Sequence, residues 1–138
     1  MINLFAYGSL MCTDIMGDVS GCDLSHTVGV LNGYRRLVVR GEQYPGLVPA
    51  DGGAVEGVVY RDVPPSAWER LDRFEGAMYV RQHVDVSLKG GSPLVADAYV
   101  VRPEFRDRLE DADWDFDEFL RNGKARFRRH YQGYRSLE

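Results

Sequence analysis

Alternating residue types in the run Tyr79–Leu88 are the feature that most constrains the fold. Valine or leucine stands at four even-numbered positions of this run, and charged side chains occupy several of the odd positions. Because side chains alternate between the two faces of a strand, the pattern predicts a strand with one buried face. Residues 89–93 have the composition of a turn and residues 94–101 are again apolar, so the two runs are expected to pair as an antiparallel hairpin.

Three further segments are strand-like. Met1–Ala6 is apolar on both faces, which predicts a central strand. Val28–Val39 is expected to form two strands around a turn at Asn32-Gly33, a dipeptide that is favoured in hairpins. Val55–Val63 is also expected to be a strand, and the prolines that follow it end the ladder because proline has no N–H group to donate.

Helices are fewer and are placed irregularly along the chain. The clearest one is expected over Ser66–Phe74, where Ser66 and Glu69 have the spacing of a capping box. Shorter helices are expected over Glu104–Leu109 and from Asp115 onward. Many strands with a few helices, and not one helix per crossover, predict an α+β fold whose mixed or antiparallel sheet curls into a small barrel.

Length, composition and charge exclude several classes of protein. A chain of 138 residues is expected to form one domain, residues 1–138, and a hydrophobic content of 44% excludes a largely disordered protein. The 21 acidic and 17 basic side chains give a net charge of −4, which disfavours nucleic acid as the main partner. No stretch approaches the roughly 20 apolar residues of a membrane span and no export signal is recognisable, so a soluble, cytoplasmic protein is expected. Cys12 and Cys22 are expected to be reduced thiols, and the sequence leaves open whether they meet.

The segment Tyr7-Gly8-Ser9-Leu10 follows the first predicted strand directly. Gly8 and Ser9 favour a turn, and the backbone N–H groups of such a turn can point together toward a carboxylate or an oxyanion. A tight turn without any ligand explains the same residues, so both interpretations stay open. Ser9 does not stand in a Gly-x-Ser-x-Gly pattern, and a serine hydrolase is therefore not indicated.

Glu75 stands at the predicted C-terminal end of the clearest helix. The free carbonyl groups at a helix C-terminus disfavour a second negative charge, and burial beside Phe74 adds to that effect. Both influences raise the pKa of a carboxyl group toward neutrality, where it can act as a general acid and base. The alternative is an exposed carboxylate that is paired with Arg73 or Arg81.

The remaining candidates carry weaker signals. The segment Tyr44–Pro49, with Gly52 and Gly53 after it, is expected to be a loop that places Tyr44 over a pocket. The tail from Lys124 onward combines basic and aromatic residues, and a solvated helix face explains it better than a nucleic acid surface. The histidines lie far apart in the sequence without metal-ligand spacing, so no metal site is expected.

Several of these segments, taken in order, resemble the gamma-glutamylcyclotransferase-like family, which is also called AIG2-like. The resemblance covers roughly the first two thirds of the chain. Its motifs are Phe5-Ala6-Tyr7-Gly8-Ser9-Leu10, Tyr44-Pro45-Gly46, Gly53-Ala54-Val55-Glu56-Gly57-Val58-Val59-Tyr60, and Leu71-Asp72-Arg73-Phe74-Glu75-Gly76 with Tyr79 and Arg81. Each motif alone is unspecific, but their order and spacing are not.

The resemblance implies a small mixed β-barrel wrapped by helices and a reaction that needs no metal or cofactor. Known members cyclise a γ-glutamyl group to 5-oxoproline and release the attached amine, so the implied partner is a small-molecule γ-glutamyl substrate. The implied catalytic residue is Glu75, as general acid and base. The implied substrate-binding residues are Tyr7, Gly8, Ser9, Leu10, Tyr44, Tyr79 and Arg81.

Two other functions fit the same residues. A binding module would hold an amine-bearing ligand against Glu75 without reaction, and an amide hydrolase would use water activated by Glu75. The sequence leaves open which amine is released and what oligomeric state the protein adopts.

Overall fold

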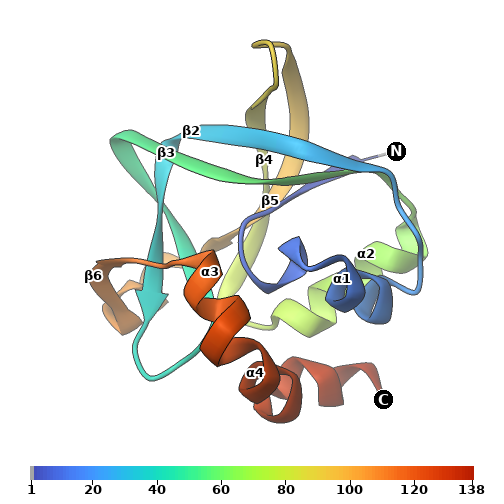
Figure 1. Cartoon of the computed structure of the whole chain (residues 1–138), viewed down its shortest axis with the longest axis vertical. Helices are drawn as coiled ribbons and strands as arrows, with labels where there is room; N and C mark the ends of the chain where they lie inside the picture. Colours follow the sequence, from blue (N-terminus) through green and yellow to red (C-terminus); the bar gives the residue numbers. More distant parts are fainter. Residues whose placement is uncertain (1) are drawn as a thin grey trace.

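The computed structural model describes residues 2–138 and contains a closed, five-stranded mixed β-barrel with a few helices packed against it (Figure 1). The barrel order is β3–β1–β5–β4–β2, and β2 pairs back with β3 to close it; β6 extends β2 outside the ring. Only the β1–β5 pairing is parallel among these strands. The strands are β1 (Ile2–Ala6), β2 (His26–Val39), β3 (Pro45–Val63), β4 (Tyr79–Leu88), β5 (Pro93–Val101) and β6 (Leu109–Asp113). The predicted α+β barrel is confirmed.

Strand β1 is central, as its sequence predicts, and it separates two regions of the core. Leu4 and Ala6 pack into one cluster of buried side chains, whereas Phe5 and Tyr7 pack into the other. Both faces of the strand are therefore covered, which explains why it lacks the alternation of a half-exposed strand. The expectation for Met1 lies outside the described residues.

The predicted turn at Asn32-Gly33 and the predicted loop at 44–53 are both wrong. Strand β2 continues through Gly33, which has φ 85° and lies where the register with β3 shifts. Between the pairs Asn32–Ala54 and Tyr34–Pro49 there is one residue in β2 and there are four in β3, so the extra residues form a bulge in β3 and β2 does not reverse. Strand β3 begins at Pro45 and pairs with β2 over residues 45–49 and again over 54–60, so it includes glycines and prolines that locally favour turns.

Helix α1 (Thr13–Ser20) was not predicted, and it is held by Ile15, Met16 and Val19, which are fully buried. Helix α2 (Pro65–Glu75) confirms the clearest predicted helix. The capping box is wrong, because the helix already begins at Pro65 and no side chain caps its first turn. Proline fits the first helical position, since its missing N–H group would have no partner there.

The C-terminal part of the chain forms short elements that cover one end of the barrel (Figure 1). They are the 3₁₀ helix η2 (Pro103–Arg108), α3 (Phe116–Glu118), the π-helical turn η3 (Phe119–Gly123), α4 (Lys124–His130) and the 3₁₀ helix η4 (Gln132–Leu137). Lys124 and Arg128 form ion pairs with Asp14 of α1, so these basic side chains of the tail connect it to another helix. Strand β6 was not predicted from the sequence.

Two further expectations concern cysteines and membranes. Cys12 and Cys22 are free thiols. Among residues 2–138, no helix is both long and apolar enough to cross a bilayer.

Gly57 of β3 lies tightly against β1, and we predict that Gly57→Ala destabilises the fold. A Cβ atom at this position would collide with the carbonyl oxygen of Ala6 and lie 2.8 Å from the Phe5 ring. Because a backbone atom cannot move aside without distorting the strand, the free energy of unfolding should fall by about 1–3 kcal/mol in urea titrations. Gly17→Ala is the matched control, since nothing lies within 4 Å of its added Cβ atom and alanine favours a helix interior. Equal stability of the two variants would contradict this assignment.

Candidate active site

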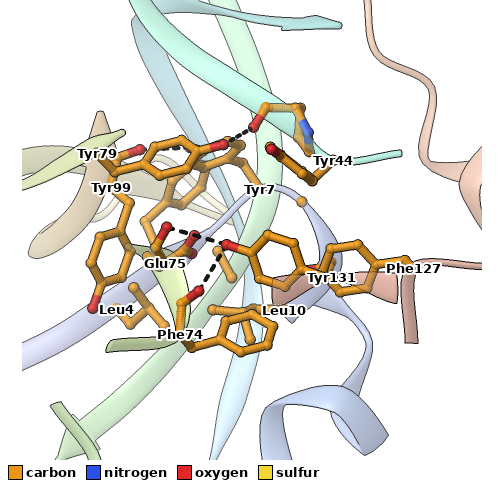
Figure 2. A pocket seen from close by; sticks show the side chains of 15 residues that line it. Leu4, Tyr7, Leu10, Tyr44, Phe74, Glu75, Tyr79, Tyr99, Phe127 and Tyr131 are labelled. Carbon is orange, nitrogen blue, oxygen red and sulfur yellow. Dashed lines mark hydrogen bonds between the residues drawn. The ribbon is translucent and has the colours of Figure 1, made fainter. Parts of the chain in front are cut away.

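A pocket lies where the end of β1, the start of β3, the end of α2 and the C-terminal tail meet. Seven of the eight residues predicted for the site line it: Tyr7, Gly8, Ser9, Leu10, Tyr44, Glu75 and Tyr79. Leu4, Phe74, Tyr99, Phe127 and Tyr131 complete much of its wall (Figure 2). The free space at its centre is only about 20 Å³, enough for one or two water molecules. Glu75 and the N-terminal turn therefore share one narrow, mostly aromatic hollow.

The turn after β1 leaves three backbone N–H groups without a protein acceptor. Residues Ser9–Met11 form the 3₁₀ helix η1, whose bonds run from Met11 N–H to Gly8 O (3.0 Å) and from Cys12 N–H to Ser9 O (3.1 Å). Within residues 2–138 we find no acceptor for the N–H groups of Gly8, Ser9 and Leu10. These groups lie at the pocket wall and can bind an anion.

Contacts from β2 and β3 hold this turn in place. The Arg36 guanidinium donates a hydrogen bond to the Tyr7 carbonyl at 2.9 Å. In a trans peptide the C=O and N–H groups point in opposite directions, so this bond turns the Gly8 N–H away from Arg36. A Cβ atom on Gly8 would lie 2.9 Å from the Pro45 ring, which explains the need for glycine. Arg36 is thus a positioning residue that the sequence did not predict, because 29 positions, including helix α1, separate it from Tyr7.

Glu75 is the last residue of α2, and its half-buried side chain faces the aromatic wall of the pocket (Figure 2). Burial, and secondly the nearby charge of Asp72, raise the pKa of Glu75 to about 8. Within residues 2–138 its carboxyl group has neither a hydrogen-bond donor nor an ion-pair partner. The alternative of a carboxylate paired with Arg73 or Arg81 is therefore wrong, since Arg73 lies 3.9 Å from Glu69 instead.

Tyrosine hydroxyl groups surround Glu75 and are themselves held by carbonyl groups. Tyr7 donates to the carbonyl of Tyr99 at 2.6 Å, and Tyr79 donates to that of Pro45 at 2.7 Å. Burial raises the pKa of Tyr7 and of Tyr79 well above the ordinary tyrosine value, so both stay protonated. Because each O–H proton is already engaged, each hydroxyl oxygen is left to accept a hydrogen bond from a ligand N–H group.

Tyr131 comes from the tail and closes the end of α2. Its hydroxyl group donates to the carbonyl oxygens of Phe74 (2.8 Å) and Glu75 (3.2 Å), which lie at the helix C-terminus (Figure 2). These are carbonyl groups that a helix end leaves without partners. Its ring packs 5.1 Å from that of Tyr44 and 4.7 Å from that of Phe127, measured between centroids. The sequence indicated Tyr131 only through the aromatic spacing of the tail, without a link to Glu75.

The structure does not bring Arg81 into the pocket. Its guanidinium lies 4.3 Å from the centre of the Trp68 ring, with Asp97 at 3.5 Å and Asp72 at 3.8 Å. Strand β4 carries Tyr79 to the pocket, but two residues farther along, about 7 Å away, α2 covers the strand. Arg81 therefore acts on the pocket at most through Asp72, and its expected place in substrate binding finds no support in the geometry.

The chemistry available in the pocket is proton transfer beside an anion-binding turn. A carboxyl group with a pKa near neutrality can both take and return a proton at physiological pH. Within the described part of the chain, no three histidine, cysteine, aspartate or glutamate side chains gather as a metal site would require. The residues present thus favour an acid–base reaction on a small, partly anionic molecule.

Comparisons with known proteins agree with this arrangement. A family model described as "Gamma-glutamyl cyclotransferase, AIG2-like" matches residues 4–116. AIG2-like protein C of Arabidopsis thaliana is 31% identical over 126 residues, which cover 91% of this chain and 73% of that protein. A protein of Arabidopsis thaliana with a solution structure has a TM-score of 0.71 at 28% identity, over 91% of this chain and 85% of that one. A structure named "Gamma-glutamyl cyclotransferase" has a TM-score of 0.66 over 79% of this chain and 68% of that one, and at 21% identity it shows the shared fold.

Proposed function

Because the chain belongs to the gamma-glutamyl cyclotransferase, AIG2-like family, we propose that it converts a γ-glutamyl amide or γ-glutamyl amino acid into 5-oxoproline and a free amine. The observation that carries this proposal is the shared pocket: the unpaired amides of the turn and the Glu75 carboxyl group line the same hollow. A γ-glutamyl group has matching chemical groups: its α-carboxylate can bind the amides of the turn, and its α-ammonium group can bind the Glu75 carboxylate.

The reaction closes a five-membered ring within the substrate. The α-nitrogen attacks the γ-carbonyl carbon and forms a new C–N bond, and the bond to the leaving nitrogen breaks. The α-nitrogen changes from an ammonium group to a lactam N–H and so loses two protons, while the departing nitrogen gains two and leaves as an ammonium group. Glu75 is proposed to take the first proton before the attack and return it to the departing nitrogen, and then to transfer the second from the ring nitrogen in the same way. No water is consumed. Because both reacting groups belong to one molecule, holding it folded supplies much of the rate enhancement.

Glu75 is suited both to take up a proton from one nitrogen and to donate it to another. In the free protein near pH 7 its carboxyl group is mostly protonated, since its pKa is raised to about 8. An ammonium group placed beside it favours the ionised form and lowers this pKa, so substrate binding itself prepares the base. The hydroxyl oxygens of Tyr7 and Tyr79 can accept hydrogen bonds from the same ammonium group.

The amides of Gly8, Ser9 and Leu10 are proposed to bind the α-carboxylate or the oxygen that becomes negative during attack. Preorganised donors of this kind stabilise charge as it develops without having to reorient. Because the centre of the pocket is narrow, a bound substrate is proposed to shift the rings of Tyr44 and Tyr131. These two rings contact each other at the border of the pocket.

The test is to incubate the protein with a panel of γ-glutamyl amino acids and γ-glutamyl amines and to identify the products by mass spectrometry. We expect 5-oxoproline and the free amine in equal amounts. Free glutamate would instead indicate an amide hydrolase. Binding by calorimetry with every substrate recovered intact would indicate a binding module, and either result would contradict the proposal.

A further inference from the structure

A second hollow adjoins the pocket and opens to the surface. We call it the outer groove; it leaves about 340 Å³ of space and shares Tyr44, Phe74, Glu75 and Tyr131 with the inner pocket. Glu75 must reach the departing nitrogen if it returns a proton to it, as the proposed function requires. Because Glu75 lines both spaces, a γ-glutamyl group in the inner pocket would direct its leaving group into the outer groove.

The outer groove carries an excess of positive charge. Arg73 and Arg108 line it, together with the neutral polar residues Gln132 and Ser136, and Glu75 is the only acidic residue among its lining. Glu42 lies close enough to raise the pKa of Tyr44 but does not line the groove. An arriving ligand therefore meets two guanidinium groups beyond the catalytic carboxyl group.

Arg108 packs over an aromatic ring but has no carboxylate partner within residues 2–138. Its guanidinium carbon lies 4.6 Å from the centre of the Phe105 ring, which also lines the groove. Among the residues that the structure describes, no aspartate or glutamate forms an ion pair with it. In the described part of the chain, the only ion pair of Arg73 is the loose one with Glu69, and both side chains are largely exposed. Planar guanidinium groups match carboxylates through paired hydrogen bonds.

We propose that the outer groove binds a carboxylate carried by the leaving amine, with Arg108 as its main contact and Arg73 beside it. This inference rests on the proposed function and narrows its substrate class. Conjugates whose released amine carries a carboxylate are preferred, and conjugates of uncharged amines are poorer substrates. Conjugates of polyamines are poorest, because their additional cations are repelled by the two arginines.

The experiment compares matched substrates that differ only in that carboxylate. γ-Glutamylalanine is paired with γ-glutamylethylamine, and 6-(γ-glutamylamino)hexanoate with γ-glutamylpentylamine, and kcat/KM for 5-oxoproline release is measured for each. The first pair places the carboxylate next to the scissile amide and the second places it far away. The pair with the larger ratio of kcat/KM, acidic over neutral member, therefore shows which position of the carboxylate the groove binds. We expect Arg108→Gln to lower kcat/KM for the preferred acidic substrate by about three- to tenfold and to leave its neutral partner unchanged.

Two controls keep this inference separate from the proposed function. Arg106→Gln removes an exposed arginine of the same 3₁₀ helix that does not line the groove, and it should change neither substrate. Binding of the same compounds to Glu75→Gln, measured by calorimetry, tests the groove even if no product forms. Equal affinity for both members of each pair, or an equal loss for both in Arg108→Gln, would overturn the carboxylate site. Selective binding without any 5-oxoproline from the wild type would support the groove and contradict the reaction.

Discussion

Glu75→Gln is expected to lower kcat for 5-oxoproline formation by about 10²- to 10⁴-fold, the range in which a positioned acid–base group contributes. Glutamine keeps the size of the side chain and its ability to form hydrogen bonds, but it cannot take the proton from the α-ammonium. Affinity for substrate should fall much less, because the amides of the turn and the aromatic wall remain. Turnover within threefold of the wild type on a verified substrate would reject the assigned role.

The stability of the same variant shows whether its loss of activity is caused by a folding defect. Folding raises the pKa of Glu75 from 4.5 to about 8, so the folded state resists ionisation of this group. The contribution of this group to the stability of the folded state is complete below pH 4.5 and is lost as the pH rises toward 8. Glu75→Gln, which never ionises, should therefore be at least as stable as the wild type at pH 8 in thermal unfolding. A large loss of stability there would mean that its inactivity cannot be attributed to proton transfer.

The second large effect is on the pH dependence of catalysis. Because the base must be ionised, kcat/KM should rise with pH along an acid limb with an apparent pKa of about 8. From pH 8 down to pH 6 the expected decrease is roughly fiftyfold. Buried tyrosines do not contribute to this limb, since burial raises the pKa of Tyr44 to about 12 and those of Tyr7 and Tyr79 well above the ordinary tyrosine value. Deprotonation of the substrate's own α-ammonium group in solution affects only the alkaline side of the kcat/KM profile.

Asp72→Asn provides the matched control for this profile. The charge of Asp72 raises the pKa of Glu75, so its removal should move the acid limb toward lower pH. Asparagine can still accept the hydrogen bond that Tyr99 donates to this position at 2.7 Å, which limits other changes. An acid limb near pH 4.5 in the wild type, or a shift toward higher pH in Asp72→Asn, would contradict the account.

Local sequence patterns predicted the parts of the fold and site that depend on local chemistry. The two covered faces of β1 can be read from its apolar run, and the end of α2 places Glu75 beside free carbonyl groups. The run 45–53 could not be predicted in this way, because its glycines and prolines favour turns. Residues 45–49 become a strand only through pairing with β2.

Arg81 illustrates a second limit, which concerns position along a strand. Alternation places Arg81 on the same side of β4 as Tyr79, but it does not say where a covering helix begins. Trp68 of α2 lies over Arg81, whereas Tyr79 reaches the pocket. Arg36 and Tyr131 escaped prediction for a related reason, since each acts through a backbone carbonyl that is distant in sequence.

The central claim is that one carboxyl group is held nearly neutral opposite an anion-binding turn. Its most direct test is a pH titration of the Glu75 side-chain carboxyl carbon by ¹³C NMR, assigned by comparison with Glu75→Gln. We predict a midpoint near pH 8 in the free protein that moves lower when a γ-glutamyl ligand binds. A midpoint near 4.5 that does not respond to such a ligand would show that Glu75 is an ordinary carboxylate, and the account would be contradicted.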